Sequence, residues 1–254
     1  MSKIITIVNQ KGGVGKTTTA VNLAAYLAFS GKKVLLIDLD PQGNASSGLG
    51  VRQEKVTASV YHLLIGQKRW QDLTMHTSVN GLHLIPSNID LAGAEIELVS
   101  IENRESVLKA SLQGIENLYT YVLIDCPPSL GLLALNGLTC ANSILIPMQA
   151  EYYAMEGLKQ LLATFQRVRD RFSPHLTIEG IVLTMVDTRS TLNTQVVEEI
   201  RSHFGEMVFK TMIPRNVTLA EAPSHGKPIL FYNPLSKGAE AYLALAQEVL
   251  QHAT

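Results

Sequence analysis

The sequence predicts an α/β fold, a doubly wound and mostly parallel sheet flanked by helices, and three observations lead to it. Apolar runs rich in β-branched residues alternate with segments of helical periodicity. Most of these runs are nearly continuous, which is typical of strands buried on both faces of a parallel sheet. A glycine-rich stretch, 9–19, joins the first expected strand to the first expected helix. Together they favour helices on both faces of one sheet.

Each element follows from its local pattern. Strands are expected at 3–9, 33–40, 81–87, 119–128, 142–148, 176–187 and 207–214. Helices are expected at 17–31, 154–172, 193–205 and 237–254. Their apolar stripes are Val21, Ala24, Leu27 and Ala28; Met155, Leu158, Leu162, Phe165, Val168 and Phe172; Val196, Val197, Ile200 and Phe204; and Ala239, Tyr242, Leu243, Ala246, Val249 and Leu250. Asn193 is the expected N-cap of the third helix, and 48–80, the least clear stretch, is expected to hold helices and loops over the sheet.

The bulk composition favours one globular domain. The 254 residues are 46 % hydrophobic and 17 % charged, without repeat, linker or break in composition. We expect a single domain over 1–254, with no N-terminal DNA-binding extension before the first strand. The formal net charge of −1 gives no overall basic field, so any contact with nucleic acid needs a local patch.

Other compositional features indicate a cytoplasmic protein. A strand is expected from residue 3, which leaves no room for a signal peptide. No apolar run reaches the roughly 18 residues needed to cross a bilayer. Cys126 and Cys140 are too few for a disulfide scaffold and form no C-x-x-C pair, so we expect two reduced, buried thiols.

The stretch "NQKGGVGKTTT" has the chemistry of a phosphate-binding loop. Glycines let backbone N–H groups converge on phosphate oxygens, and the helix N-terminus behind them adds its dipole. Lys16 is expected at the β and γ phosphates and the Thr17 hydroxyl on Mg²⁺. The loop departs from the common pattern, because Gln10 stands where the first glycine should be and Lys11 follows it. The loop residues expected at the nucleotide are Lys11, Gly12, Gly13, Val14, Gly15, Lys16, Thr17 and Thr18.

Carboxylates follow two of the expected strands. Asp125 ends "YVLID", where a carboxylate would hold Mg²⁺ directly or through water. Asp38 and Asp40 end the second strand two residues apart, so alternation sends both to one side. One of them would tune the metal shell and the other would position or activate the attacking water. The sequence therefore predicts Thr17, Asp38 and Asp125 around the metal, and Lys11, Lys16 and Asp40 as catalytic groups.

Five segments resemble a known family. "KGGVGKTT" resembles the deviant Walker A motif of the ParA/MinD superfamily of P-loop NTPases. "LLIDLDPQGNASSGLG", "YVLIDCPPSLGLLALNGL", "PMQAEYYAMEGL" and "IPRNVTLAEAPSHGKPI" resemble the ParA/Soj partitioning ATPases. The likeness runs from Lys3 to about Leu250.

The resemblance implies a Mg²⁺-dependent ATPase that partitions chromosomes or plasmids. In its ATP state it would form a sandwich homodimer and bind double-stranded DNA on the nucleoid without sequence preference. A ParB-type partner would stimulate hydrolysis and release. Lys11 matches the extra lysine that crosses to the partner subunit's phosphates. Pro214 and Asn216 match the adenine loop, and Met185 and Asp187 lie where a base-side loop would follow its strand.

The DNA-binding residues are a looser match. Arg189 matches a basic residue that the family uses on DNA, but Thr218 stands where the family often has a second arginine. Arg215, Lys227 and Lys237, together with Lys210, could supply phosphate contacts in its place, because such contacts need charge rather than base recognition.

The sequence leaves four competing hypotheses open. A MinD-like membrane-cycling ATPase would need a basic amphipathic tail, but the last helix carries only Lys237, Glu240 and Glu248. An electron-transfer relative, like the nitrogenase iron protein, would need interface thiolates, and the spacing of Cys126 and Cys140 does not match. A biosynthetic ligase would need a second-substrate site, and none is recognisable. Asp40 argues against a non-hydrolysing switch.

Overall fold

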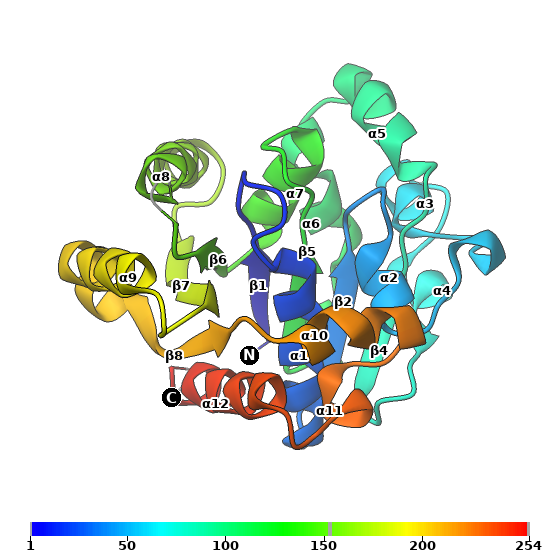
Figure 1. Ribbon diagram of the computed structural model, residues 1–254. Coiled ribbons are helices and arrows are strands. Elements are labelled where there is room, and N and C mark those ends of the chain that lie inside the picture. The colour runs from blue at the N-terminus through cyan, green and yellow to red at the C-terminus, as the bar shows by residue number, and fades with distance from the viewer. Residues whose placement is uncertain (1, 152–153, 253–254) are drawn as a thin grey trace.

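The computed structural model describes residues 2–151 and 154–252, and within them one eight-stranded sheet forms the centre (Figure 1). The strand order is β3-β4-β2-β5-β1-β6-β7-β8. The strands are β1 (Lys3–Ile7), β2 (Val34–Asp38), β3 (Met75–His76), β4 (Leu82–Ile85), β5 (Tyr121–Asp125), β6 (Ser143–Gln149), β7 (Thr177–Val186) and β8 (Val208–Pro214).

Helices connect and cover these strands. They are α1 (Lys16–Phe29), α2 (Asn44–Gly48), α3 (Val60–Leu64), α4 (Trp70–Leu73), α5 (Leu91–Glu97), α6 (Val107–Ser111), α7 (Leu132–Cys140), α8 (Ala154–Arg171), α9 (Thr191–Phe204), α10 (Val217–Glu221), α11 (Ile229–Tyr232) and α12 (Lys237–Gln251). Short 3₁₀ turns are η1 (Gln53–Lys55), η2 (Leu98–Ser100), η3 (Arg104–Ser106), η4 (Ile115–Asn117), η5 (Gly205–Met207) and η6 (Ala222–His225).

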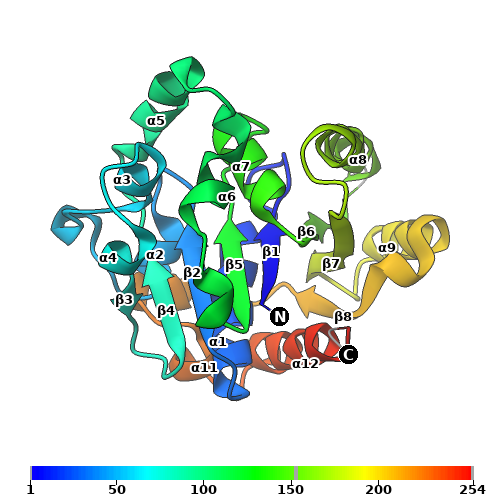
Figure 2. The ribbon, with the colours of Figure 1, turned by 180° about the vertical axis from the view of Figure 1, so that it is seen from behind.

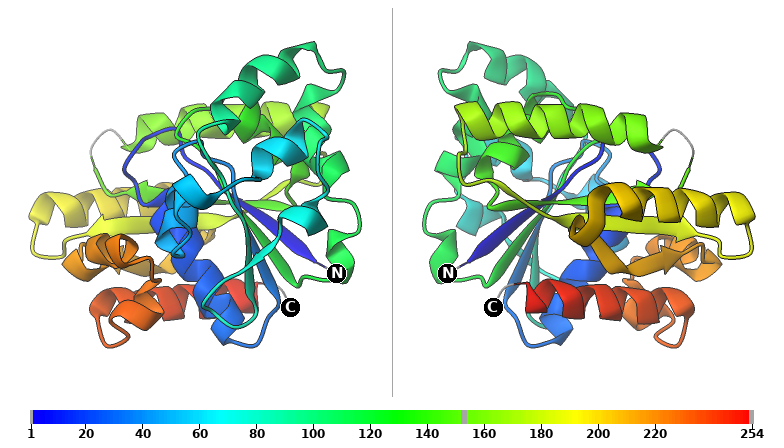
Figure 3. Two further views of the ribbon diagram at one scale, coloured as in Figure 1. Left: turned by 90° about the vertical axis from the view of Figure 1, so that its right-hand side faces the viewer. Right: turned by 90° about the vertical axis from the view of Figure 1, so that its left-hand side faces the viewer.

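Successive strand residues face opposite layers of the molecule. On β2, Leu35 and Ile37 join one buried cluster with residues of α7, α8 and α9, whereas Val34 and Leu36 join another with residues of α1 and α12. Figures 2 and 3 show the two layers, with α8 on one side of the sheet and α1 and α12 on the other. The central strands are therefore buried on both faces, which explains their continuous apolar runs.

The strands confirm the predicted α/β class. Seven expected strands are present, though most are shorter than expected, and they pair in parallel. The two-residue strand β3 was not predicted and pairs antiparallel with β4 at the sheet edge. Two residues are too few for a periodic signal. The segment 48–80, expected to hold helices and loops, contains η1, α3 and α4, and also the unpredicted strand β3.

Three details of the predicted helices were wrong. The N-cap of α9 is Ser190, whose side chain accepts from the backbone N of Asn193, so Asn193 lies inside the helix. In α12, Leu243 is 36 % exposed and Leu245 takes the buried position. Phe172 lies beyond the end of α8 and is exposed. In each case the predicted position, whether a cap, a buried residue or a helix end, differs from the observed one by one to three residues.

The carboxyl ends of the parallel strands gather the predicted nucleotide residues. The glycine-rich loop follows β1, Asp38 and Asp125 end β2 and β5, and Pro214 ends β8. Residues 39 to 43 and 214 to 216 continue from the same edge. Ligands of open α/β sheets bind at this edge, where loops from neighbouring strands converge.

Candidate nucleotide site

The glycine-rich loop adopts a conformation that its glycines make accessible. Gly13 and Gly15 have φ of 74° and 87°, and Gly15 caps the N-terminus of α1. An added side chain would be strained at either position. A hollow of about 340 Å³ opens over the loop and the start of α1. It is lined by Gly12, Gly13, Gly15, Lys16, Thr17, Thr18, Asp40, Gln42, Asn44, Pro128 and Met185. It therefore combines free backbone N–H groups with a helix N-terminus.

The two lysines of the loop point to different places. The side chain of Lys16 is largely buried, and its Nζ donates to the carbonyl O of Lys11 at 3.0 Å. Burial lowers the pKa of Lys16, while Asp125 and Asp40 act in the opposite direction. The Nζ of Lys11 pairs instead with Glu151, and its side chain is 48 % exposed. Lys16 thus lines the hollow, whereas Lys11 does not line it and is exposed to solvent beside Glu151.

Val14 and Thr18 complete the loop. Val14 is buried and does not line the hollow, and its carbonyl O accepts from the Thr184 hydroxyl at 2.8 Å. Thr18 lines both the phosphate hollow and a second pocket behind it. Thr18 therefore lies where the two pockets adjoin.

Asp38 is fully buried and hydrogen-bonded on both oxygens. Its Oδ2 accepts from the backbone N and the hydroxyl of Ser46, both at 2.7 Å, and its Oδ1 accepts from the backbone N of Asp40 at 3.3 Å. Burial raises the pKa of Asp38 to about 6 against these hydrogen bonds. Ser46 was missed by the sequence analysis, because a serine in a short helix carries no signal of its own.

Asp125 lies beside Asp38 in the register of β2 and β5, and it too is fully buried. Neither of its oxygens has a hydrogen-bond partner in the described residues, although the Thr17 hydroxyl lies near enough to favour the charged form. Burial raises the pKa of Asp125 well above its ordinary value, and Asp38 adds to the rise. A buried carboxylate without a partner suits a cation.

The donor set fits Mg²⁺ in particular. Within 2–151 and 154–252, no group of three or more His, Cys, Asp or Glu side chains is arranged to hold a metal. Mg²⁺ does not require one, because it commonly takes one or two carboxylates and completes its shell with water and substrate phosphates. Asp125 and the Thr17 hydroxyl beside the phosphate hollow meet that requirement.

A second pocket of about 200 Å³ adjoins the phosphate hollow through Gly15, Thr18 and Met185. Its wall contains Thr184, Ile213, Pro214, Arg215, Asn216, Leu219, Ala220 and Tyr242. The Oδ1 of Asn216 caps α10 by accepting from the backbone N of Leu219 at 3.3 Å. The amide nitrogen of Asn216 is then the group left to meet a ligand. The pocket is the right size and polarity for a nucleobase.

Met185 has an unusual backbone. Its φ is 51°, one of two positive values among the described residues other than glycine. A left-handed conformation is costly for a bulky side chain, and such strain gathers at ligand sites. Met185 is the second-last residue of β7, and it lines both the phosphate hollow and the smaller pocket.

Comparison with known proteins identifies the chain. A family model described as an AAA domain matches residues 2–178. The sporulation initiation inhibitor protein Soj of Bacillus subtilis is 56 % identical over 249 residues, which are 98 % of each protein. The chromosome-partitioning ATPase Soj of Treponema pallidum is 51 % identical over 250 residues, again 98 % of each. The chain belongs to the ParA/Soj family of partitioning ATPases.

A solved structure supports the fold and the cofactors of this ParA/Soj-type ATPase. Cobyrinic acid a,c-diamide synthase from Mycobacterium smegmatis, with bound ADP and magnesium, superimposes with a TM-score of 0.88 and 37 % identity, covering 100 % of this chain and 96 % of that one. The predicted cofactors, ATP and Mg²⁺, agree with it. Its name is that of a biosynthetic enzyme, but the partitioning relatives are more similar in sequence.

The cysteines and the last helix bear on the electron-transfer and membrane-cycling hypotheses. Cys126 and Cys140 are free and buried, as expected, so neither thiol is presented at the surface to share a cluster with another subunit. The last helix of the ParA/Soj-type chain packs on β8 and α1 through Ala239, Tyr242 and Ala246. Among the described residues, no helix is both long enough and apolar enough to span a bilayer.

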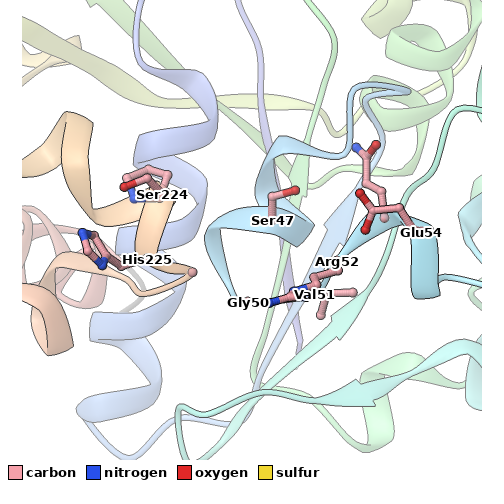
Figure 4. A pocket seen from close by; sticks show the side chains of 10 residues that line it. Ser47, Gly50, Val51, Arg52, Glu54, Ser224 and His225 are labelled. Carbon is pink, nitrogen blue, oxygen red and sulfur yellow. The ribbon is translucent and has the colours of Figure 1, made fainter.

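A hollow larger than the phosphate hollow lies elsewhere in the described residues. About 600 Å³ in volume, it is enclosed by the segment after α2 and by η6 (Figure 4). Its lining is Ser47, Gly50, Val51, Arg52, Gln53, Glu54, Pro223, Ser224, His225 and Gly226. None of these residues lines the phosphate hollow, so the larger volume of this hollow does not mark it as the candidate nucleotide site of this ParA/Soj-type ATPase.

The basic residues expected at DNA are all exposed, but they do not form one cluster. Arg189 makes two hydrogen bonds of 2.9 Å to the carboxylate of Asp187, and this pairing lowers the pKa of Asp187 to about 2. Arg215 lies near enough to Asp187 to add to that shift. Lys227 lines a separate hollow with Thr17 and Thr18, and Lys237 begins α12. The structure therefore brings Arg189 and Arg215 together and leaves the two lysines apart.

Asn193 connects two loops at the carboxyl edge. Its Nδ2 donates to the carbonyl O of Ala150 after β6 at 2.8 Å, and its Oδ1 accepts from the backbone N of Asp187 after β7 at 3.1 Å. The residue that the sequence suggested as a helix cap thus joins the loop that carries Glu151 to the turn that carries Arg189.

The pKa of Asp38 predicts how stability depends on pH without magnesium and nucleotide. Because the folded pKa of about 6 exceeds the unfolded value, stability is present at low pH and is lost as pH rises through about 6. Asp38→Asn removes this dependence. When the pH rises from about 4.5 to about 7.5, the free energy of unfolding should fall in both proteins. We expect the fall to be smaller for Asp38→Asn than for the wild type, and the difference between the two to be about 2 kcal/mol.

Urea denaturation in EDTA at several pH values measures this difference. Comparing slopes with pH, rather than absolute stabilities, removes the constant effect of changing the hydrogen bonds to Ser46. Asp170→Asn, an exposed change on α8, serves as the control. Parallel pH profiles for Asp38→Asn and the wild type would contradict the raised pKa.

Proposed function

We propose that this chain is an ATP-switched DNA-partitioning protein. Two ATP-loaded copies would face each other across the carboxyl edge of their sheets, and this sandwich dimer would bind double-stranded DNA without sequence preference. A ParB-type partner would stimulate hydrolysis, after which the dimer would separate and leave the DNA. In the cell this cycle places the protein in the cytoplasm on the nucleoid, with 1–254 acting as one ATPase domain.

The observation that carries the proposal is the outward lysine of the phosphate loop. Lys16 already supplies a cation inside the hollow, while Lys11 leaves the same loop toward solvent. A second, exposed lysine on the same loop could bind the phosphates of a nucleotide carried by a facing subunit. A cation delivered by a facing subunit would make hydrolysis depend on dimerisation, as arginine fingers do in other phosphoryl-transfer proteins.

The remaining groups have separate roles. Lys16 and the N–H groups of the loop would hold the phosphates. Asp125 and Thr17 would hold Mg²⁺, which neutralises phosphate charge when bound, and Asp38, held in place by Ser46, would tune the metal shell. Asp40 lines the phosphate hollow with its Oδ1 fixed by the backbone N of Gln42 at 2.9 Å. We assign to it the positioning of the attacking water.

The base and the DNA would lie at neighbouring parts of this edge. Pro214 and Asn216 would contact the adenine in the smaller pocket, next to Met185. Arg215 and Arg189 would contact DNA phosphates, with Arg189 exchanging Asp187 for a phosphate oxygen. Lys227 and Lys237 would add charge from a different part of the surface, as a dimer doubles every contact.

ATP-dependent DNA binding tests the proposal directly. With a non-hydrolysable ATP analogue and Mg²⁺, we expect the wild type to bind long duplex DNA, and without nucleotide we expect little binding. The affinity should fall steeply with salt, because each phosphate contact releases counterions. Fluorescence anisotropy at several salt concentrations measures both. Equal binding with and without nucleotide, or a flat response to salt, would contradict the proposed cycle.

Variants of the basic residues refine the same measurement. Arg189→Ala and Arg215→Ala should each lower the salt slope by about one per lost phosphate contact, with no change in sequence preference. Lys68→Ala, an exposed lysine between α3 and α4, is the matched control and should leave the slope unchanged.

A further inference from the structure

Glu151 provides Lys11 with a partner inside its own chain. The Nζ of Lys11 is paired with Oε2 of Glu151, which lies two residues beyond the end of β6. The two side chains are 48 % and 45 % exposed. Water reaches both groups, so the pair can open without leaving a bare charge in the core.

The backbone on each side of this pair is held in place. Asn9 ties the phosphate loop to β6: its Nδ2 donates to the carbonyl O of Pro147 at 2.7 Å, and its Oδ1 accepts from the backbone N of Lys11 at 3.0 Å. The carbonyl just before Glu151 accepts from Asn193. The carboxylate and the ammonium therefore meet without much further ordering of the chain.

We propose that Glu151 is an exchangeable counter-ion, which holds Lys11 on its own subunit until the phosphates of a facing subunit replace it. This inference rests on the proposed role of Lys11 across the dimer. A carboxylate offers one negative charge and a triphosphate offers several, so the exchange becomes favourable when an ATP-loaded subunit arrives. Glu151 is then a positioning residue that sets how readily loaded subunits associate.

Removing the charge of Glu151 should ease dimerisation. Two pairs open for each dimer formed, and an exposed ion pair contributes about 0.2–1 kcal/mol. We therefore expect Glu151→Gln to lower the dimer dissociation constant by about 2- to 30-fold. Sedimentation velocity over a range of protein concentrations, with saturating non-hydrolysable ATP analogue and Mg²⁺, measures this constant. Glu156→Gln, in the first turn of α8, is the matched control and should behave like the wild type.

A double-mutant cycle separates the ion pair from any other role of Glu151. In the nucleotide-free chain, Glu151→Gln should lower the melting temperature in the wild-type background and have no effect in the Lys11→Ala background. The coupling expected for an exposed pair is about 1–3 °C. A residue with a purely structural role would act equally in both backgrounds, and that result would overturn the proposal.

The outcomes for dimerisation distinguish this proposal from the function on which it rests. If Lys11→Ala loses ATP-dependent dimerisation while Glu151→Gln matches the wild type or dimerises less well, the counter-ion role is wrong and the role of Lys11 stands. If Lys11→Ala dimerises and hydrolyses ATP like the wild type, both are wrong. Tighter association of Glu151→Gln, together with coupling to Lys11, supports the counter-ion role.

Discussion

Lys11→Ala is expected to lower ATP hydrolysis by about 10³- to 10⁵-fold, the range seen when a cation supplied from a partner is removed in other phosphoryl-transfer proteins. The ammonium would be lost from the facing subunit's phosphates, where charge develops during the reaction. Binding of ATP to the single chain should change little, because Lys16 and the glycine loop remain. Phosphate release and nucleotide titration measure the two effects separately.

Mixing variants tests whether Lys11 acts across the dimer. In a mixed dimer of Lys11→Ala with Asp40→Ala, the Lys11→Ala subunit keeps its own Asp40 and receives Lys11 from its partner. One complete site results, so two inactive proteins should regain activity on mixing. No recovery in mixed dimers, verified by affinity capture of one tagged variant, would place Lys11 in its own subunit's site. Lys33→Ala, at the opposite edge of the sheet before β2, controls for loss of a surface charge.

Asp40→Ala is expected to lower hydrolysis by about 10²- to 10⁴-fold while ATP binding persists, because a positioned general base contributes this much. The expectation rests on the position of Asp40 in the phosphate hollow, next to Lys16 and Gly12. Since the loop and Asp125 are unchanged, the ATP-bound dimer should still form and should stay on DNA. Phosphate release and DNA dissociation in the presence of ATP measure these results.

Asp40→Asn tests whether the carboxylate charge of Asp40, rather than its support of the turn, is needed for hydrolysis, and Asp170→Ala is the control. Asp40→Asn keeps the size of the side chain and an oxygen for the N–H of Gln42, so it should show the same loss of hydrolysis with less disturbance of the turn. Asp170→Ala changes an exposed carboxylate on α8 and should hydrolyse ATP normally. If Asp40→Ala fails to bind ATP, the residue supports the loop and does not position the water.

The fold was predictable because its strands are long enough to show their environment. The strands around Ile5, Leu36 and Leu123 are buried on both faces. Strands in this environment have nearly continuous apolar sequences, which can be recognised without a structure. The edge strand β3 was missed because its two residues are both exposed and carry no period. The start of α9, the end of α8 and the buried face of α12 were misplaced for a related reason: several residues within one turn satisfy the same pattern.

The grouping of the candidate site residues was predictable where a charged side chain stands next to a strand end or the glycine-rich loop. Lys16 begins α1 after the glycine-rich loop and Asp125 ends β5; Lys16 lines the phosphate hollow, and Asp125 lies near enough to act on its pKa. The supporting residues were not predictable. Ser46 reaches Asp38 from another element, and Glu151 reaches Lys11 across 140 positions of the chain. Such contacts depend on how the elements are stacked, which local periodicity does not record.

Asn193 has a consequence for how signals pass along this edge. Its amide joins the loop after β6 to the turn after β7, so neither can shift freely without the other. Equilibrium coupling of this kind is reciprocal. If nucleotide binding near Ala150 changes the affinity of the Arg189 turn for an anion, an anion bound at Arg189 changes the affinity for nucleotide by the same free energy. A ligand held at either loop would then raise or lower the affinity at the other by the same factor.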